Sequence, residues 1–374
     1  MRTRVVVAPD KFKGSATAAE VAAALSAGLR RGRPELDVLE LPVADGGDGT
    51  VAAALAAGFA PVAVTAAGPT GEPVETTFAL KDGTAVVELA DAAGLRRLPG
   101  GFAPLIASTY GVGQVIAAAL DHGARRIVLG VGGSASTDGG AGMVQALGAR
   151  LADQDGVALE RGGAALCRIA AVDLAGLDRR LRGAAVLVAS DVDNPLLGPS
   201  GAAAVFGPQK GASRDDVALL ERGLVRWAWL TRAATGREVA AEPGAGAAGG
   251  TGFAALAYLD ARLVPGIDLV LDLVGFDSAV AGADLVVTGE GCLDTQSLGG
   301  KAPVGVARAA ARHGVPVVAV AGSVLLTREE LAAAGFAAAY SLARIEPDLA
   351  RGIARVSELL DQVGRQIAAS ALVA

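Results

Sequence analysis

Residues 186–212 read VLVASDVDNPLLGPSGAAAVFGPQKGA, and they predict a buried strand that ends in a cluster of polar side chains. The apolar run Val186–Ala189 has the length and composition of a strand, and Pro195 prevents further pairing because it lacks an N–H. Asn194 is the only asparagine in the chain, and Lys210 is one of only five lysines. Because both rare residues stand in one segment, we interpret it as part of a functional site.

The remaining lysines support this interpretation. Arginine supplies most of the 33 basic residues, and a compact ammonium interacts with anions differently from a planar guanidinium. Lys81 stands in the hairpin turn Lys81-Asp82-Gly83 and needs no further function. The other three stand in polar, Gly-rich segments: Lys11, Lys13 and Lys301.

Strands and helices alternate on both sides of the opening segment. Strands are predicted at Val5–Ala8, Val38–Leu41, Ile127–Val131, Leu285–Thr288 and Val317–Ala321. Helices are predicted after the capping box Thr17–Glu20, at Tyr110–Asp121, Arg214–Ala233 and Ala302–His313, and at the end over Asp348–Ser370. A hairpin is predicted over 74–90. Alternating strands and helices are typical of a parallel sheet with functional loops at the carboxyl ends of its strands.

The predicted fold class is α/β, with a Rossmann- or flavodoxin-like parallel-sheet domain and a second α/β domain inserted in it. A chain of 374 residues is too long for one ordinary core. We expect residues 1–70 and 246–374 to form the discontinuous Rossmann-like domain and 71–245 the inserted one. The active site is expected in the cleft between them.

Composition excludes several classes of protein. Hydrophobic residues make up 52% and charged residues 19%, which indicates a packed protein rather than a disordered one. The net charge of −6 provides no basic field for nucleic acid or an anionic membrane, and Gly, Pro or charges interrupt every long apolar run. Cys167 and Cys292 fit no metal spacing, and His122 and His313 belong to helical patterns, so zinc sites and His-based triads are not expected. We expect a cytoplasmic monomer or homodimer whose partners are small molecules.

Two loops near the N-terminus combine charge with glycine. In the first, Lys11 and Lys13, with Ser15, could meet phosphate oxygens beside a helix N-terminus; the alternative is an exposed, solvated loop. In the second, Asp45 and Asp48 could hold Mg²⁺ or accept substrate hydroxyls. The alternative there is turn chemistry, with Asp48 capping the next helix.

Gly132–Gly142 is the strongest Gly-rich loop. Its small residues would let backbone N–H groups approach an anion, and Ser134, Ser136 and Asp138 add side-chain ligands. It is no Walker A loop, because it lacks the Gly-Lys-Ser/Thr ending. The alternative is a tight turn with Asp138 as helix cap.

Acidic residues mark two further loops. After the strand at 186–189, Asp191 could act as base toward a hydroxyl, assisted by Asp193 and Asn194; the alternative is an Asx-type turn before Pro195. The other loop, 289–301, contributes Glu290, Asp294, Gln296 and Lys301, which suit metal–nucleotide binding or else a salt-bridged surface loop.

Taken together, acids, retained lysines and Gly-rich strand ends suit phosphoryl transfer, in which positioning and charge neutralisation dominate. A nicotinamide-dependent hydroxy-acid dehydrogenase is disfavoured, because no G-x-G-x-x-G follows the first strand. A solute-binding protein is the non-enzymatic alternative, disfavoured by the lack of a signal peptide and by more acids and lysines than binding needs.

Five blocks resemble the bacterial glycerate kinases of the type that makes 2-phosphoglycerate. They are APDKFKGS at 8–15, PVADGGDGT at 42–50, GVGGSASTDGGAGMVQALG at 130–148, SDVDNPLLGPSGAAAVFGPQKGA at 190–212 and TGEGCLDTQSLGGKAP at 288–303. The resemblance runs nearly end to end. It implies ATP- and Mg²⁺-dependent phosphorylation of D-glycerate in organic-acid breakdown, and a flavodoxin-like domain carrying an inserted α/β domain.

Roles for individual residues within that activity are our own hypothesis. Asp191 is expected to be the base, positioned with Asp193 and Asn194, and Lys11 acts with them in catalysis. The substrate- and phosphate-binding candidates are Lys13, Ser15, Asp45, Asp48, Ser134, Ser136, Asp138, Lys210, Glu290, Asp294, Gln296 and Lys301. Which loop binds ATP and which binds glycerate is left open.

Overall fold

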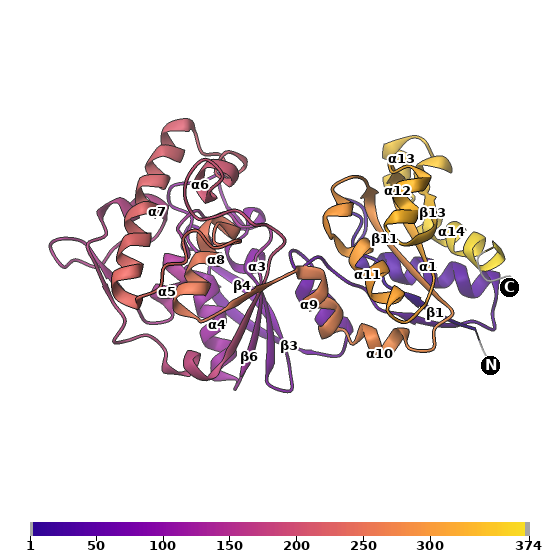
Figure 1. Ribbon diagram of the computed structural model, residues 1–374, viewed down its shortest axis with the longest axis horizontal. Helices are drawn as coiled ribbons and strands as arrows, with labels where there is room; N and C mark the ends of the chain where they lie inside the picture. The colour runs from indigo at the N-terminus through magenta and orange to yellow at the C-terminus, as the bar shows by residue number, and fades with distance from the viewer. Residues whose placement is uncertain (1–2, 371–374) are drawn as a thin grey trace. The chain divides into compact units, whose positions relative to one another are not determined.

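The computed structural model describes residues 3–370 and divides them into two compact units. Unit 1 contains the described residues up to Asp45, then Ala52–Gly58, and the chain from Ile267 onward; unit 2 contains Gly46–Val51 and Phe59–Gly266. In Figure 1, unit 1 carries both the indigo and the yellow end of the chain. The boundaries differ from the expected residues 70 and 246. The strands Ala60–Ala67 and Arg262–Val264 were expected in the Rossmann-like domain, but they pair with the sheet of unit 2.

Unit 1 is built on a parallel sheet of five strands. These are β1 (Arg4–Val7), β2 (Asp37–Glu40), β11 (Leu285–Leu293), β12 (Val317–Val324) and β13 (Phe336–Ser341). Their order in the sheet is β13-β12-β11-β1-β2, so the chain builds outward in one direction from β1 and then in the other from β11. This is the flavodoxin-like strand order, and its switch point lies between β1 and β11.

Helices cover both faces of this sheet, which explains why its strands are continuous apolar runs. The helices are α1 (Ala18–Gly32), α2 (Thr50–Ala56), α9 (Gly266–Leu273), α10 (Phe276–Val280), α11 (Ala302–Ala311), α12 (Arg328–Ala333), α13 (Leu349–Ala354) and α14 (Val356–Ser370). Val5 and Val7 pack in one core with α1 and α14, while Val6 packs in the other with α9, α10 and α11. The alternation follows from the two-residue period of a strand.

Unit 2 is built on a mixed sheet in the order β10-β9-β6-β5-β4-β3. The strands are β3 (Ala60–Ala67), β4 (Pro73–Lys81), β5 (Thr84–Glu88), β6 (Arg126–Gly130), β9 (Ala185–Ala189) and β10 (Arg262–Val264). β5, β6, β9 and β10 are parallel, whereas β4 runs antiparallel to both its neighbours. β7 (Arg150–Ala152) and β8 (Ala171–Asp173) form a separate pair.

One continuous core joins this sheet to its helices. They are α3 (Leu89–Ala93), α4 (Tyr110–Asp121), α5 (Ala141–Ala146), α6 (Ala202–Phe206), α7 (Arg214–Thr235) and α8 (Ala247–Tyr258). Trp227 of α7 is fully buried and stacks on Tyr258 of α8. Among residues 3–370, no helix has the length and apolar character needed to cross a membrane.

The structure confirms the predicted α/β class with a second α/β domain inserted into a flavodoxin-like one. The helix at Tyr110–Asp121 and the hairpin turn at Asp82-Gly83 are also confirmed. Two local predictions are wrong. β11 continues past Thr288 to Leu293, so Glu290 lies in a strand rather than a loop, and the closing helix is interrupted at Arg355.

Candidate functional site

The predicted site residues fall into both units. Unit 1 contains Lys11, Lys13, Ser15, Asp45, Glu290, Asp294, Gln296 and Lys301, and unit 2 contains Asp48, Ser134, Ser136, Asp138, Asp191, Asp193, Asn194 and Lys210. Each unit is described by itself below.

The centre of the unit 1 group is the switch point of the sheet. Asp10 follows β1 and Glu290 lies in β11, and the Asp10 N–H donates to the carbonyl of Gly289 at 2.8 Å. Both acids are largely buried, with exposed fractions of 7% and 8%. Flavodoxin-like folds bind ligands in the crevice at this place, so the topology itself points to a site here.

Burial and crowding keep these two carboxyl groups from ionising easily. The pKa of Asp10 is raised to about 7, chiefly by burial and also by the nearby carboxylates of Asp45 and Glu290, while Lys11 opposes the shift. Burial likewise raises the pKa of Glu290; a hydrogen bond with Ser297 and the charge of Lys301 oppose this shift, and the charges of Asp294 and Asp45 add to it. The switch point therefore gathers several acids and two lysines within electrostatic reach of one another.

One oxygen of this group has no partner. Glu290 Oε1 is buried and forms no hydrogen bond within residues 3–370. A buried acceptor without a partner is costly, and a cation or a donor from a ligand would satisfy it. Across the described chain, the structure brings no three His, Cys, Asp or Glu side chains into an arrangement that could hold a metal ion. Mg²⁺ commonly needs only one or two carboxylates, with phosphate and water as its other ligands, so the donors of this cluster suit it.

The remaining unit 1 candidates surround the cluster. Lys11 Nζ lies 3.5 Å from Asp10 Oδ1, and Lys13 is exposed. The Ser15 hydroxyl donates to the Phe12 carbonyl at 3.0 Å, so it closes the turn after Lys13. Asp294 Oδ1 accepts from the N–H of Gln296 at 2.9 Å. These last two contacts favour turn-forming roles for Ser15 and Asp294.

Lys301 is the N-cap residue of α11, so this lysine and the first N–H groups of the helix both lie at the N-terminus of α11. The positive end of the helix dipole and a lysine both favour an anion. Among the predicted residues of unit 1, Lys301 therefore has the position best suited to a phosphate group.

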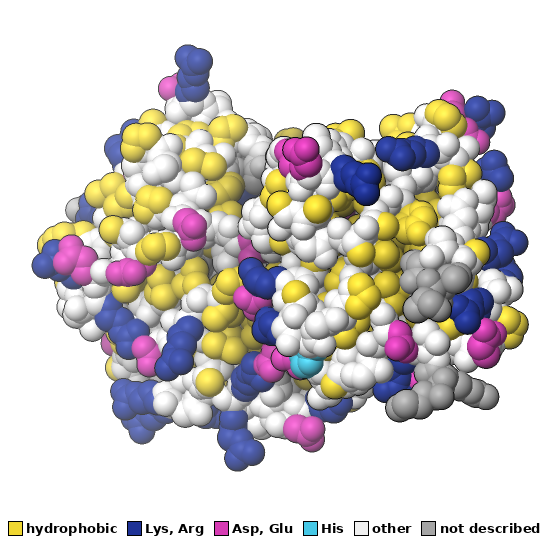
Figure 2. Space-filling model, turned by 45° about the vertical axis from the view of Figure 1, so that its right-hand side comes forward, with side chains coloured by type: hydrophobic (Ala, Val, Ile, Leu, Met, Phe, Trp, Pro, Cys, Tyr) yellow, Lys and Arg dark blue, Asp and Glu magenta, His cyan; other side chains and the backbone are white. Residues whose placement is uncertain are grey.

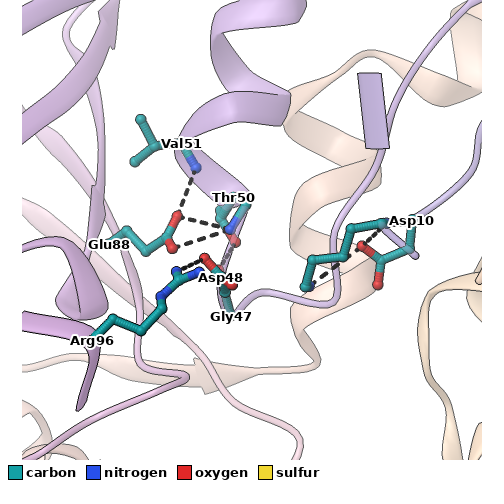
Figure 3. A network of polar contacts seen from close by, with 9 residues as sticks. Asp10, Gly47, Asp48, Thr50, Val51, Glu88 and Arg96 are labelled. Atoms are coloured by element: carbon teal, nitrogen blue, oxygen red, sulfur yellow. Dashed lines mark hydrogen bonds and ion pairs between the residues drawn. The ribbon is translucent and has the colours of Figure 1, made fainter. Parts of the chain in front are cut away.

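In unit 2, a carboxylate that sequence reasoning missed organises the loop before α2. Both oxygens of Glu88 lie 3.1 Å from the Gly49 N–H, and Oε2 also accepts from Val51 at 3.3 Å (Figure 3). The Thr50 hydroxyl donates to the Gly47 carbonyl at 2.7 Å, and Asp48 forms an ion pair with Arg96. The only sequence signal for Glu88 was a charged residue at the end of a buried strand.

Glu88 is 5% exposed, and its surroundings disfavour its charge. Its pKa is raised to about 8, chiefly by burial and also by the nearby Asp91 and Asp48, while the N–H groups of Gly49 and Val51 oppose the shift. A carboxyl group that is neutral at pH 7 in this place can fix the loop without adding a buried charge close to Asp48 and Asp91.

The Gly-rich loop 132–140 has buried polar side chains rather than exposed ligands. Asp138 is fully buried, and it accepts hydrogen bonds from the N–H groups of Thr109, Gly140 and Gly142 and from the hydroxyls of Ser108 and Thr109. Its carboxylate therefore fixes the turn into α5, although the N-cap residue of that helix is Gly140 and not Asp138. Ser134 and Ser136 are also buried.

The segment that opened the sequence analysis follows β9 at the carboxyl edge of the sheet. Asp191 is exposed, and its Oδ1 accepts from the Gly266 N–H at 2.8 Å, which fixes the orientation of the carboxylate. Asp193 is exposed as well. Asn194 Nδ2 donates to the Ser200 carbonyl at 2.8 Å and so closes the loop from 194 to 200. Asp191 is thus the acid of this segment best placed for chemistry.

The histidines have the structural roles expected of them. His122 Nδ1 lies 2.9 Å from the Ala118 carbonyl, and its ring packs edge-on against Phe78. His313 Nε2 lies 3.0 Å from Asp277 Oδ1 at the end of α11. On the face seen in Figure 2, Lys and Arg side chains are interspersed with Asp and Glu side chains.

Comparison with known proteins agrees with this geometry. The model of the glycerate kinase family matches residues 5–372. The chain belongs to the glycerate kinase family. The resemblance stated from the sequence is thereby confirmed, and this family member is a kinase that acts on a small molecule.

Its relatives cover nearly the whole chain. A glycerate kinase of Bacillus subtilis (strain 168) is 46% identical over 98% of this chain and 97% of its own. A glycerate 2-kinase of Escherichia coli (strain K12) is 44% identical over 86% and 85%. A crystal structure from Salmonella typhimurium LT2, provisionally assigned as glycerate kinase 2, is 41% identical with a TM-score of 0.88, covering 99% of this chain and 98% of that one.

Proposed function

We propose that this chain transfers the γ-phosphoryl group of ATP to the C2 hydroxyl of D-glycerate, giving 2-phosphoglycerate and ADP in the breakdown of organic acids. The observation that carries the proposal is the group of acids and lysines at the switch point of the unit 1 sheet. The name of the Escherichia coli relative, glycerate 2-kinase, supports the choice of hydroxyl.

Unit 1 is proposed to hold the phosphate donor. Lys11, Lys13 and Lys301 would meet phosphate oxygens, and the N-terminus of α11 adds backbone N–H groups. One or two of the carboxylates of Asp10, Asp45 and Glu290 would hold Mg²⁺, because a cation would satisfy the buried, partnerless Glu290 Oε1. When bound, Mg²⁺ neutralises charge on the phosphate oxygens. Asp48 is the weaker of the two metal candidates named from the sequence, since it pairs with Arg96.

Unit 2 is proposed to hold the acceptor. Asp191, oriented by the Gly266 N–H, would accept the proton of the glycerate hydroxyl as the oxygen–phosphorus bond forms and the bond to ADP breaks. Asp193 would help to orient the hydroxyl. The backbone of loop 132–140 would receive the substrate carboxylate, because its glycines let the main chain come close to an anion.

The test is an assay of the purified protein with ATP, Mg²⁺ and D-glycerate. ADP release is followed, and the product is identified by ³¹P NMR. We expect 2-phosphoglycerate. If 3-phosphoglycerate forms instead, the kinase assignment stands and the choice of hydroxyl is wrong. The absence of ADP above background, together with turnover of NAD(H), would overturn the kinase assignment.

A further inference from the structure

Lys210 is a fully buried lysine in the middle of unit 2. Its exposed fraction is 1%, and it ends the short 3₁₀ turn Pro208–Lys210. Its Nζ donates to the hydroxyl of Ser134 at 2.8 Å and to the carbonyl of Ser136 at 2.5 Å. Lys210 therefore joins the segment after β9 to the Gly-rich loop after β6, where its partners Ser134 and Ser136 lie 76 and 74 residues before it in the sequence.

These contacts are unusual for a lysine. A buried ammonium normally has a carboxylate partner, whereas both direct partners here are neutral oxygens. Burial lowers the pKa of Lys210 to about 7, and nearby Asp138 opposes this only in part. An apolar side chain of similar length would fill the same space without desolvating an amine. Packing alone therefore does not account for the lysine, whereas its two hydrogen bonds join two separate segments of unit 2.

A second element holds the same loop. Ala248, Gly249 and Gly250 have φ values of 51°, 67° and 93°, so three consecutive residues adopt left-handed conformations where α8 begins. The Gly139 N–H donates to the Gly249 carbonyl at 2.9 Å. A Cβ on Gly249 would lie 2.1 Å from the Ser136 carbonyl oxygen, so only glycine allows this approach. For a non-glycine residue such as Ala248 this conformation is strained, and strain of this kind gathers at functional sites.

The loop does not satisfy its own polar groups. Ser136 Oγ and Thr137 Oγ1 are buried and have no hydrogen-bond partner within residues 3–370. Its shape therefore depends on the contacts with Lys210, with the left-handed turn 248–250 and, through Asp138, with the start of α4. Among these three contacts, only the one with Lys210 is a hydrogen bond from a side chain to the Ser136 carbonyl.

We propose that Lys210 is a positioning residue of this kinase: it does not touch phosphate but fixes Ser134 and Ser136 so that loop 132–140 presents its backbone to the acceptor substrate. This replaces the expectation that Lys210 binds substrate or phosphate directly. The inference rests on the proposed function only in assigning the acceptor to this loop.

The test compares Lys210→Met with the wild type. Methionine is an unbranched apolar side chain that is one atom shorter, and it removes both hydrogen bonds. Lys81→Met is the matched control, because Lys81 is an exposed hairpin residue of the same unit. Hydrogen exchange is measured by mass spectrometry on the ligand-free proteins. We expect peptides from 132–140 to exchange at least tenfold faster in Lys210→Met, and not in the control.

Kinetics give the second readout. Lys210→Met is expected to raise the KM for D-glycerate at least tenfold while the KM for ATP changes less than twofold. A merely structural lysine would lower the amount of folded enzyme without separating the two constants. If Lys210→Met does not fold, Ser134→Ala removes one acceptor and keeps the amine, and it should accelerate exchange in the same peptides.

Two results would overturn the proposal. One is unchanged exchange in 132–140 for the variants that fold. The other is a rise of at least tenfold in the KM for ATP with an unchanged KM for D-glycerate, which would mean that Lys210 contacts the nucleotide. If the wild type fails to phosphorylate glycerate, the proposed function fails, and the exchange comparison still decides whether Lys210 holds the loop.

Discussion

Glu88 holds the loop between Asp45 and α2 because it is a hydrogen-bond acceptor placed at the end of a buried strand. Sequence reasoning found the loop through its glycines and acids but not this partner, which stands about forty residues away. The same holds for Asp48, whose partner Arg96 had no distinguishing feature in the sequence. Rare residue types locate a site, whereas the contacts that decide their roles depend on which strands become neighbours.

The pH dependence of stability tests the state of Glu88. A carboxyl group whose pKa is higher in the folded than in the unfolded chain stabilises the fold fully below the unfolded value and loses that effect as pH rises through the folded value. For Glu88 the window runs from 4.5 to about 8. Glu88→Gln cannot titrate, so the wild type should lose stability relative to it by up to about 1.4 kcal/mol per pH unit.

Thermal unfolding of both proteins between pH 5 and 8 measures this difference. The comparison uses only the difference in stability between the two proteins at each pH. The contributions of other titrating groups, such as Asp10, therefore cancel. Glu75→Gln, an exposed change on β4, is the control and should leave the slope unaltered. Parallel curves for Glu88→Gln and the wild type would mean that Glu88 is ionised in the folded protein across this range.

Asp191 gives the second prediction at this scale. Asp191→Asn keeps an oxygen for the Gly266 N–H and removes the capacity to accept a proton. We expect kcat to fall by about 10²–10⁴, the usual contribution of a general base, with little change in the KM for ATP. Asp215→Asn, on the exposed start of α7, should behave as the wild type. Near-normal turnover of Asp191→Asn would refute the proposed base.

Individual elements were more predictable than partners. The capping box at Thr17 and Glu20 is present, and α1 starts where it predicts. β11 was predicted too short because Gly289 and Gly291 suggest a turn. In the structure, a Cβ on Gly289 would lie 2.0 Å from the Val320 carbonyl oxygen, so the glycine serves close packing of two strands. A glycine that permits close approach and one that permits a turn look alike in a sequence.

Close approach also governs the pairing of α1 with α14. Gly28 lies against the backbone of α14, and a Cβ there would stand 2.1 Å from the Asp361 carbonyl oxygen. Gly28→Ala should therefore destabilise unit 1 by about 1–3 kcal/mol, the usual cost of overpacking, despite alanine's higher helix propensity.

The matched control for that change is Gly352→Ala in α13, where the added Cβ would lie 3.7 Å from the nearest atom, the Glu346 carbonyl oxygen. There the helix propensity of alanine should act alone, and stability should stay unchanged or rise by up to about 1 kcal/mol. Midpoints of thermal unfolding compare both variants with the wild type. Equal effects of the two substitutions would contradict the close packing of α1 on α14.

At the scale of the whole molecule, alternating strands and helices predicted parallel sheets, but not their strand order. β1 pairs with β11, across some 280 residues, and no local pattern indicates such a partner. The resemblance to a known family supplied what periodicity could not. Once β1 and β11 are neighbours, Asp10 and Glu290 must stand together, so the long-range pairing creates the switch-point cluster.

The two units give the last prediction, because the proposed function assigns one substrate to each. A bound ligand stabilises the segments that contact it, by an amount that grows with its concentration relative to its Kd. In hydrogen-exchange measurements, ATP with Mg²⁺ should slow exchange in peptides from 8–16 and 288–303, and D-glycerate alone should slow it in 132–140 and 186–200. Adenosine, which lacks phosphates, is the control and should not protect the segments that carry Lys11 and Lys301. Protection of 132–140 by ATP, with 288–303 unaffected, would reverse the assignment. The phosphate donor would then bind to unit 2, and the acids at the switch point would not lie beside its phosphates.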